Sequence, residues 1–438
     1  MSDIISRDLA VNWHPYTQMK DHAEHPPLVV ERAEGIYLFD ADGRDYIDAI
    51  SSWWCNVLGH NHPAITAAIS QQAQTLTHVM FAGITHEPAV ALSEKLLELS
   101  SSHFARVFYS DNGSTAVETA MKASLQYWAL IGQPKKTQFV SLDHGYHGDP
   151  IGTMSVSGVS TFNDRFASRY TPSFKIPVPD ITQKPESLSE QGFIKTCENA
   201  LAAYLKTHNH DVAAVIVEPL LQAAAGFRIY PAEFLTAIRD ITDTYGAHLI
   251  VDEVATGFGR TGHLFASDAA HIEADFMCLS KGLTSGSLPF AATLTTAPIY
   301  DAFYGDFSEN KTFYHGHTYC ANPLGCAVSL ATLDTIESEN VLANVDDLAQ
   351  HLAARLPEFY AYGTNCRQIG SVIAMEIAPV QSERIGPIIH QAGLAHGIFI
   401  RPLGNTLYLM PPLVMTVDQL NTLCDRVLRV LADVKDML

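Results

Sequence analysis

His248-Leu249-Ile250-Val251-Asp252-Glu253 is a short apolar run that ends in two carboxylates. A run of this length is typical of a strand buried on both faces of a parallel sheet. Similar runs occur at Arg106–Tyr109, Phe139–Leu142, Ala213–Val217 and Phe276–Leu279. Segments with helical periodicity lie between them, at Ala116–Leu130 and Glu233–Tyr245. This alternation predicts an α/β fold, in which a mostly parallel sheet is covered by helices on both faces.

The 438 residues are enough for more than one structural unit, and we place a large domain at residues 61–325. The N-terminal segment, residues 1–60, contains a predicted hairpin around an Asp42-Gly43 turn. The C-terminal segment, residues 326–438, alternates helices with strands such as Ser371–Ile377 and Thr406–Met410. We expect these two segments to pack together as one smaller α+β domain.

The boundary between the last two units is marked by Asn322-Pro323. Asparagine is a favoured helix cap, and proline is favoured at the first helical position. We therefore predict a helix that begins here and ends near Glu337.

The composition excludes several classes of partner. Hydrophobic residues make up 47% of the chain, charged residues 17%, and the formal net charge is −20. So negative a chain is a poor partner for nucleic acid or an anionic membrane. The N-terminus lacks the features of a signal peptide, and no apolar run is long enough to span a bilayer. The seven scattered cysteines favour reduced thiols in the cytoplasm and form no zinc-site spacing.

Polar side chains follow three of the predicted strands where each strand ends. Asp252 ends one, Ser280-Lys281-Gly282 follows another, and Asp143–Asp149 follows a third. Open α/β sheets bind ligands at this edge, where a partly desolvated lysine can act as a nucleophile. An Asp–Lys pair there is typical of imine chemistry, although an ordinary ion pair would use the same two residue types.

A possible phosphate site follows the strand Arg106–Tyr109. Gly113 would let backbone amides approach an anion, and a helix that begins near Thr115 would add a favourable dipole. Thr115 and Glu118 have the spacing of a capping box. An ordinary capped turn explains the same residues.

Two further motifs are weak. Gly257–Gly262 matches G-x-G-x-x-G, but five residues separate it from the preceding strand, so a dinucleotide site is not expected. The 20 histidines include close pairs such as His144 and His147, yet none has metalloprotease spacing or a convincing carboxylate partner. We predict no metal site.

Trp53-Trp54 fits core packing and a substrate channel equally well.

Together these motifs resemble the class III aminotransferases, which are fold-type I enzymes dependent on pyridoxal 5′-phosphate. The resemblance runs from Trp13 to Pro412, and its main signature is Leu249–Gly262 followed by Ser280-Lys281-Gly282. Further segments resemble the members that act in biotin biosynthesis: Trp13–Thr17, Ser51–Trp54, His78–His86 and Tyr146–Asp149. The resemblance implies 8-amino-7-oxononanoate and S-adenosylmethionine as substrates.

The resemblance also implies residue roles. The catalytic residues would be Lys281, as the Schiff-base lysine and proton shuttle, Asp252, at the ring nitrogen, and Tyr16. The cofactor would be held by Gly113, Ser114, Tyr146, Asp252, Lys281, Gly316 and Thr318. The substrates would be bound by Tyr16, Trp53, Trp54, Tyr146, Arg260, Lys281, Gly316 and Arg401, with Arg401 taking the carboxylate of the oxo acid.

Gly316 and Thr318 are implied to reach the phosphate of a partner subunit, so a homodimer is expected. His317 stands between them, where similar sequences often have proline, and this departure leaves lysine open as the amino donor. The cofactor residues alone would equally suit a class III aminotransferase for ω-amino acids or diamines, a racemase or aminomutase, or a cofactor-binding protein without activity.

Overall fold

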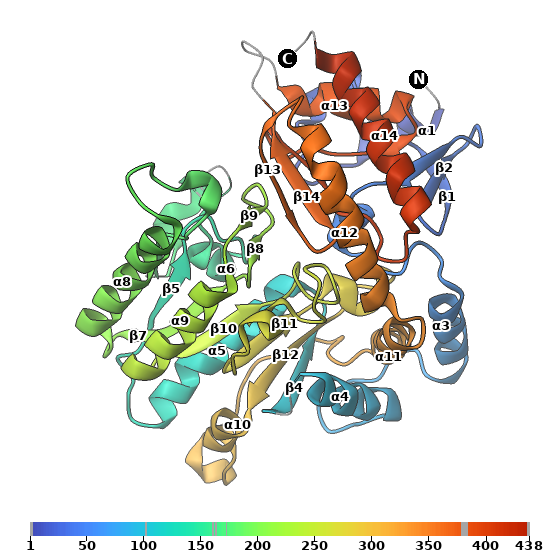
Figure 1. The fold of residues 1–438 in the computed structure, drawn as a ribbon. Helices are drawn as coiled ribbons and strands as arrows, with labels where there is room; N and C mark the ends of the chain where they lie inside the picture. Colours follow the sequence, from blue (N-terminus) through green and yellow to red (C-terminus); the bar gives the residue numbers. More distant parts are fainter. Residues whose placement is uncertain are drawn as a thin grey trace.

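The computed structural model describes residues 3–100, 103–159, 162, 164–171, 173–377 and 384–435. Met1 and Ser2, at the start of the N-terminal segment, lie outside the described residues. Two bodies are visible in Figure 1: a large sheet with its helices, and a smaller group of helices and strands beside both chain ends.

The large body is built on a seven-stranded sheet. Its strands, in spatial order, are β4 (Phe104–Ser110), β12 (Ala291–Thr296), β11 (Phe276–Leu279), β10 (His248–Asp252), β7 (Val212–Val217), β5 (Gln138–Leu142) and β6 (Ser173–Ile176). Neighbours from β11 to β6 are parallel, whereas β12 is antiparallel to both β11 and β4. The five predicted strands and the mostly parallel sheet are confirmed; β6 and β12 were not predicted.

Alternate residues of these strands enter two separate cores, as the pleat of a strand requires. Ile250 packs with Ala116 and Val117 on one face, whereas Leu249 and Val251 pack on the other. Helices α5 (Gly113–Leu130) and α10 (Ala297–Phe303) contribute to the first core. The second core receives α4 (Glu87–Leu99), α8 (Glu190–His208) and α9 (Ala232–Tyr245). Burial on both faces explains why the strands are continuously apolar.

The small body joins the two ends of the chain. One sheet contains β1 (Val30–Glu34), β2 (Tyr37–Asp40), β3 (Asp45–Asp48) and β15 (Ile398–Phe399), and another contains β13 (Thr364–Ile369), β14 (Val372–Glu376) and β16 (Thr406–Leu409). β15 pairs with β3, so a C-terminal strand extends the N-terminal hairpin. The core that the two sheets share also includes side chains of α12 (Val341–Phe359), α13 (Ile385–Ala395) and α14 (Val417–Val434). The predicted α+β unit from both ends is confirmed, while its boundaries at residues 60 and 325 stay a prediction.

The predicted helix after Asn322 is α11 (Pro323–Ser338). The Asn322 side chain accepts hydrogen bonds from the amides of Leu324 and Gly325, at 3.0 and 3.3 Å. The cap and the position of the proline are therefore confirmed. Figure 1 shows α11 next to the start of α12, which leads up to the small body.

The remaining elements are short or peripheral. They are α1 (Asp3–Val11), α2 (Ser51–Trp54), α3 (Pro63–Thr75), α6 (Ile151–Val156), β8 (Leu221–Gln222), β9 (Arg228–Ile229) and short 3-10 helices. None of the described helices is both long enough and apolar enough to cross a membrane.

Candidate active site

The polar ends of the parallel strands meet at one edge of the sheet. β10 ends at Asp252, which is paired in register with Cys278 on β11, three residues before Lys281. Glu218 follows β7, the strand on the other side of β10. The sequence thus places a lysine and two carboxylates at the edge where α/β sheets bind ligands.

Lys281 is partly buried, with a backbone φ of 48°. Loss of water around its amine lowers the pKa of Lys281, and the charges of Asp252 and Glu218 oppose this effect. Its Nζ lies 4.5 Å from the centre of the Trp54 ring. A left-handed backbone is uncommon for lysine and persists only when the surrounding structure imposes it. The backbone at Lys281 is therefore fixed by its surroundings, and its amine is more readily deprotonated than that of a surface lysine.

Asp252 is buried, and both of its carboxylate oxygens have partners. Oδ2 lies 2.8 Å from Nδ1 of His147, and Oδ1 accepts the amide of Val254 at 3.1 Å. His147 is itself buried, and its amide donates to Ser157 at 2.9 Å. The carboxylate is thus fixed in a low-dielectric environment, where it can stabilise a positive charge at short range.

The N-terminus of α5 lies against the loop that follows Asp252. A Cβ atom on Gly113 would come within 2.5 Å of Val254 Cγ1, so only glycine fits at this position. The helix begins at Gly113, and its capping box is formed by Asn112 and Thr115. The predicted box of Thr115 and Glu118 is wrong, because the Glu118 carboxylate instead accepts the amide of Thr153, at 2.8 Å.

Gly113 and Ser114 are the first residues of an 18-residue helix. The amides of a first helical turn have no partner within the helix, and the dipole favours an anion there. A Cβ atom on Gly148 would collide with the Ser114 hydroxyl, so the Tyr146–Asp149 loop passes close to this turn. This geometry suits a phosphate group.

Tyr16 and Tyr146 share one carboxylate. Both hydroxyls donate to Asp149 Oδ1, with a distance of 3.1 Å for Tyr146, and the two hydroxyl oxygens lie 3.2 Å apart. Burial, followed by the Asp149 bond, raises the pKa of Tyr16 to about 12. The Tyr16 ring lies 5.2 Å from Phe162 and 5.4 Å from Trp53. Tyr16, Tyr146, Trp53 and Phe162 form one aromatic surface, which we call the aromatic wall. The Asp149 carboxylate accepts the hydroxyls of its two tyrosines.

Arg401 approaches the same wall. Its Nη2 donates to the carbonyl of Tyr16 at 2.8 Å, and its guanidinium carbon lies 5.2 Å from the centre of the Trp53 ring. Trp54 lies deeper, where its Nε1 donates to the Tyr408 hydroxyl at 3.2 Å. The structure therefore brings Tyr16, Trp53 and Arg401 together, and Trp54 beside Lys281.

The turn that carries both tryptophans is left-handed. Ser51, Ser52, Trp53 and Trp54 have φ values of 49°, 46°, 72° and 75°. For residues other than glycine, this conformation costs roughly 1–2 kcal/mol each. The surrounding contacts must therefore offset a substantial local strain.

Arg260 is buried behind Trp54. Its guanidinium donates to the carbonyl oxygens of Pro411, Trp54 and Asn56, at 2.5, 3.4 and 3.5 Å. These contacts link the tryptophan turn to the chain after β16. A direct contact between Arg260 and substrate stays a prediction.

Gly316 and Thr318 lie on an exposed loop beside α5. His315, in the same loop, is 3.0 Å from Lys122 Nζ and 3.1 Å from the Thr119 hydroxyl. His317 Nε2 lies 3.8 Å from Asp111. The contacts of this loop are with α5 and Asp111, away from Lys281 and Asp252. The reach of Gly316 and Thr318 into a partner subunit stays a prediction.

Three residues of this site were not predicted to act in it. His147 and Asp149 lie in the loop that follows β5, yet only the structure shows their contacts with Asp252 and the two tyrosines. Glu218 is buried and accepts the amides of Tyr146 and Ala223, at 2.8 and 3.3 Å. Its position directly after β7 was the available signal. Burial, with a smaller effect of Asp252, raises the pKa of Glu218 to about 8.

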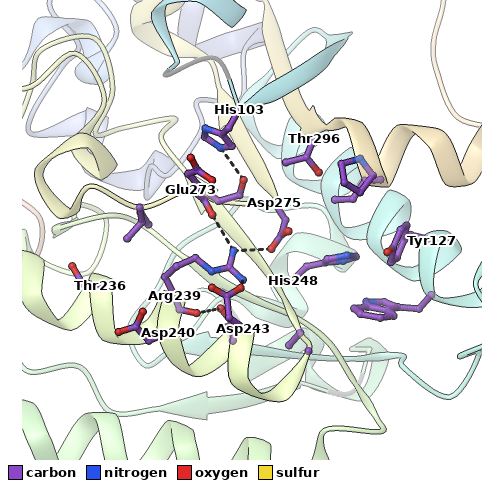
Figure 2. A pocket seen from close by; sticks show the side chains of 18 of the residues that line it. His103, Tyr127, Thr236, Arg239, Asp240, Asp243, His248, Glu273, Asp275 and Thr296 are labelled. Carbon is purple, nitrogen blue, oxygen red and sulfur yellow. Dashed lines mark hydrogen bonds and ion pairs between the residues drawn. The ribbon is translucent and has the colours of Figure 1, made fainter.

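A separate cleft of about 700 Å³ lies at the amino end of β10 (Figure 2). Arg239 is occupied by its neighbours in this cleft: it contacts Asp275 at 2.8 Å and the carbonyl of Glu273 at 3.1 Å, and it also contacts Asp243. Figure 2 shows Arg239 at the centre of these contacts, with Asp275 and Asp243 beside it. The cleft lacks the lysine and aspartate pair, and it lies at the wrong end of the strands for a ligand site of this fold.

Within the described parts of the chain, no three His, Cys, Asp or Glu side chains are grouped to hold a metal ion. All seven cysteines are unpaired.

The chain is similar to known proteins of one family over most of its length. Residues 18–431 match the family model of class III aminotransferases. An adenosylmethionine-8-amino-7-oxononanoate aminotransferase of Synechococcus elongatus is 43% identical, over 93% of this chain and 95% of that protein. The crystal structure of an enzyme with that name from Methanocaldococcus jannaschii has a TM-score of 0.92 and 36% identity, over 98% of both chains. An amine transaminase from an uncultivated Pseudomonas species, in its PLP-bound (internal aldimine) form, has a TM-score of 0.91 and 32% identity, over 97% of this chain and 98% of that one.

Proposed function

The chain belongs to the class III aminotransferases, and we propose that it transfers an amino group from S-adenosylmethionine to 8-amino-7-oxononanoate in biotin biosynthesis. The product would be 7,8-diaminononanoate, and the donor would leave as its oxo acid. The placement of Lys281 and Asp252 at the ends of adjacent strands supports the amino transfer, and the similarity to enzymes of that name supports the choice of donor and acceptor. The fold is the fold-type I architecture of these enzymes.

The enzyme depends on pyridoxal 5′-phosphate, and the residues present fit this group. Gly113 leaves room for close approach at the start of α5, which suits the phosphate. The fixed Asp252 carboxylate suits the ring nitrogen. When bound, the cofactor supplies an aldehyde that accepts amines and a ring that withdraws electrons.

Lys281 is the proposed covalent anchor and general acid–base. Its lowered pKa leaves more of the amine uncharged near neutral pH, so it can take a proton from the carbon that bears the donor amine. Asp252 is the proposed partner of the ring nitrogen and holds a proton there. Tyr146 would stack on the ring, while its amide is held by Glu218 at 2.8 Å.

The aromatic wall is the proposed substrate site. Tyr16, Trp53 and Trp54 offer apolar surface to the alkyl chain of the oxo acid. Arg401 is suited to its carboxylate, because a guanidinium binds carboxylates in a bidentate manner. Tyr16 is also proposed as a catalytic residue, since its hydroxyl is held by Asp149. Arg260 and Gly316 complete the proposed set.

We further propose a homodimer in the cytoplasm. Gly316 and Thr318 lie on an exposed loop from which they could reach a neighbouring subunit, and the proposed role of this loop is to complete the partner's phosphate site. The unpaired cysteines suit a reducing compartment. Light scattering of the purified protein tests the dimer: a monomer at micromolar concentration would contradict it.

A donor panel tests the proposed reaction. Purified enzyme loaded with the cofactor receives 8-amino-7-oxononanoate and one of three donors: S-adenosylmethionine, lysine or an ω-amino acid. We expect 7,8-diaminononanoate, detected by mass spectrometry, with S-adenosylmethionine as the best donor. Product from lysine alone would change the donor assignment. No product from any donor would contradict the proposed acceptor, and aldehyde or oxo-acid acceptors would then identify a related transaminase.

A further inference from the structure

The left-handed turn Ser51–Trp54 closes as a helical turn. The amide of Trp54 donates to the carbonyl of Ile50 at 2.8 Å, and the amide of Cys55 donates to that of Ser51 at 3.0 Å. In a left-handed turn, each Cβ atom approaches the following carbonyl oxygen, and none of these residues is glycine. Four strained residues in succession need external contacts to hold them.

Asp48 provides such contacts. It is the last residue of β3 and is fully buried. Its Oδ2 accepts the Ser52 hydroxyl at 2.7 Å and lies 3.0 Å from His60 Nε2, while Oδ1 accepts the amide of Ile50 at 3.3 Å. One carboxylate therefore binds the residue before the turn, a residue within it and a residue after it.

The partners of His60 in this cluster indicate which of its ring nitrogens carries the hydrogen. Asn56 Nδ2 lies 2.8 Å from His60 Nδ1, and an amide nitrogen can only donate, so Nδ1 accepts. Nε2 then carries the hydrogen that points to Asp48. Asn56 thus donates to His60, and His60 and Ser52 both donate to the Asp48 carboxylate, which joins the two sides of the turn.

Two further contacts hold the turn, one to the chain after β16 and one to the chain after β10. The Ser51 hydroxyl donates to the carbonyl of Met410 at 2.7 Å, and Arg260 donates to the carbonyl of Trp54 at 3.4 Å. These contacts fix where the turn lies. The Asp48 contacts cross the turn itself, and so they bear on its handedness.

The handedness decides what the two indoles face. Trp53 lies 5.4 Å from the Tyr16 ring and 5.2 Å from the Arg401 guanidinium. Trp54 lies 4.5 Å from Lys281 Nζ. If the turn relaxed to right-handed or extended backbone, the two side chains would leave these positions together.

We propose that Asp48 is a positioning residue for the oxo acid, because it holds the left-handed turn that sets Trp53 against Tyr16 and Arg401. The proposal rests on the proposed function of the site. The Asp48 carboxylate is occupied by the turn and by His60, and it acts on the substrate wall only through them. Its removal is expected to loosen the wall while the lysine and aspartate of the cofactor site stay in place.

Asp48→Ala is the first test. We expect KM for 8-amino-7-oxononanoate to rise about 10- to 100-fold, as for a misplaced binding group, with kcat changed less than about threefold. The visible absorbance of the bound cofactor should be unchanged. Equal losses in kcat and in cofactor binding would overturn the proposal, because they would indicate general damage to the fold.

Glycine rescue is the decisive test. Glycine adopts the left-handed conformation without a Cβ penalty. Adding Ser52→Gly to Asp48→Ala should therefore bring the raised KM most of the way back to the wild-type value. The matched control is Ser70→Gly in the same background, since Ser70 lies in the right-handed helix α3. Equal behaviour of the two double variants would rule out a role of Asp48 in handedness.

A readout without substrate separates this proposal from the proposed function. Near-ultraviolet circular dichroism of the cofactor-free protein reports the surroundings of the tryptophans. We expect Asp48→Ala to change this spectrum, and Ser52→Gly, but not Ser70→Gly, to restore it. If the alanine variant does not fold, Asp48→Asn serves in the same pairs, because it keeps the size of the side chain. An unchanged spectrum in a folded Asp48 variant would contradict the proposal even if the donor panel succeeds.

Discussion

The cofactor edge of the large sheet and the aromatic wall above it are built in different ways. At the edge, Asp252 is the last residue of β10 and Lys281 comes two residues after the end of β11, so the sheet fixes where both lie. In the wall, Tyr16 and Trp53 come from distant segments of the chain, and Arg401, from a third segment, lies beside them. The backbone of Trp53 is left-handed. Chemistry common to a family can rest on a rigid sheet, whereas substrate choice rests on loops that each depend on several partners.

The difference predicts separable effects of mutation. Changes at the cofactor edge should reduce turnover with every substrate pair. Changes in the wall should alter substrate affinity and leave the cofactor in place.

Lys281→Ala removes the proposed anchor and proton carrier. We expect turnover to fall by on the order of 10²–10⁴-fold or more, and the visible absorbance of the lysine-bound cofactor to disappear. Lys195→Ala, an exposed residue of α8, is the matched control and should behave as the wild type. A retained visible band would mean that another lysine is the anchor.

Asp252→Asn removes the charge at the proposed ring-nitrogen site. We expect a loss of about 10²–10³-fold in kcat with every donor, while part of the cofactor remains bound. The control is Asp240→Asn on the exposed side of α9. Near-normal turnover of Asp252→Asn would contradict its role in holding the ring proton.

Arg401→Ala removes the proposed carboxylate contact of the wall. A charged hydrogen bond contributes about 1.5–3 kcal/mol, so KM for the oxo acid should rise by about 10- to 100-fold. The absorbance of the bound cofactor should not change. Arg32→Ala, at the exposed strand β1, is the control. If both KM values matched the wild type, the carboxylate would have to bind elsewhere.

Glu218→Gln tests the buried carboxyl group that follows β7 at the cofactor edge. Folded Glu218 keeps its proton up to a pKa of about 8, whereas the unfolded chain loses it near 4.5. The folded state therefore binds more protons in this window, so Glu218 makes the wild type lose stability as the pH rises through it.

Glutamine cannot titrate, so the stability of Glu218→Gln relative to the wild type should increase from about pH 5 to about pH 8. Urea unfolding of the cofactor-free proteins measures this difference, with Glu98→Gln on the exposed side of α4 as the control. A constant difference across the range would mean that Glu218 is ionised in the folded protein.

The same contrast explains what the sequence could predict. Strands β10 and β11 were predictable because burial on both faces leaves continuous apolar runs. β12 was missed because it contains three threonines, and the hydroxyl of Thr293 is satisfied by the carbonyl of Ala116 at 2.8 Å. Such a contact depends on tertiary packing, which a local pattern does not record.

The wall was predictable only in its residue types. Tyr16, Trp53 and Arg401 were named through resemblance, but their mutual distances depend on three separate loops. The left-handed turn carries no glycine or asparagine that would indicate it. Asp48 holds this conformation from outside the segment, so it could not be read from the local sequence.

The pairing of β15 with β3 has a consequence for biosynthesis of the chain. During translation, the N-terminal strand that contains Ile47 emerges first, yet its parallel neighbour, Ile398–Phe399, is made about 350 residues later. The apolar side chains of Ile36 and Ile47 must therefore remain without their final core while the whole large body is synthesised. A ribosome that stalls before residue 398 would release a chain with an open strand edge, which is a substrate for chaperones or aggregation.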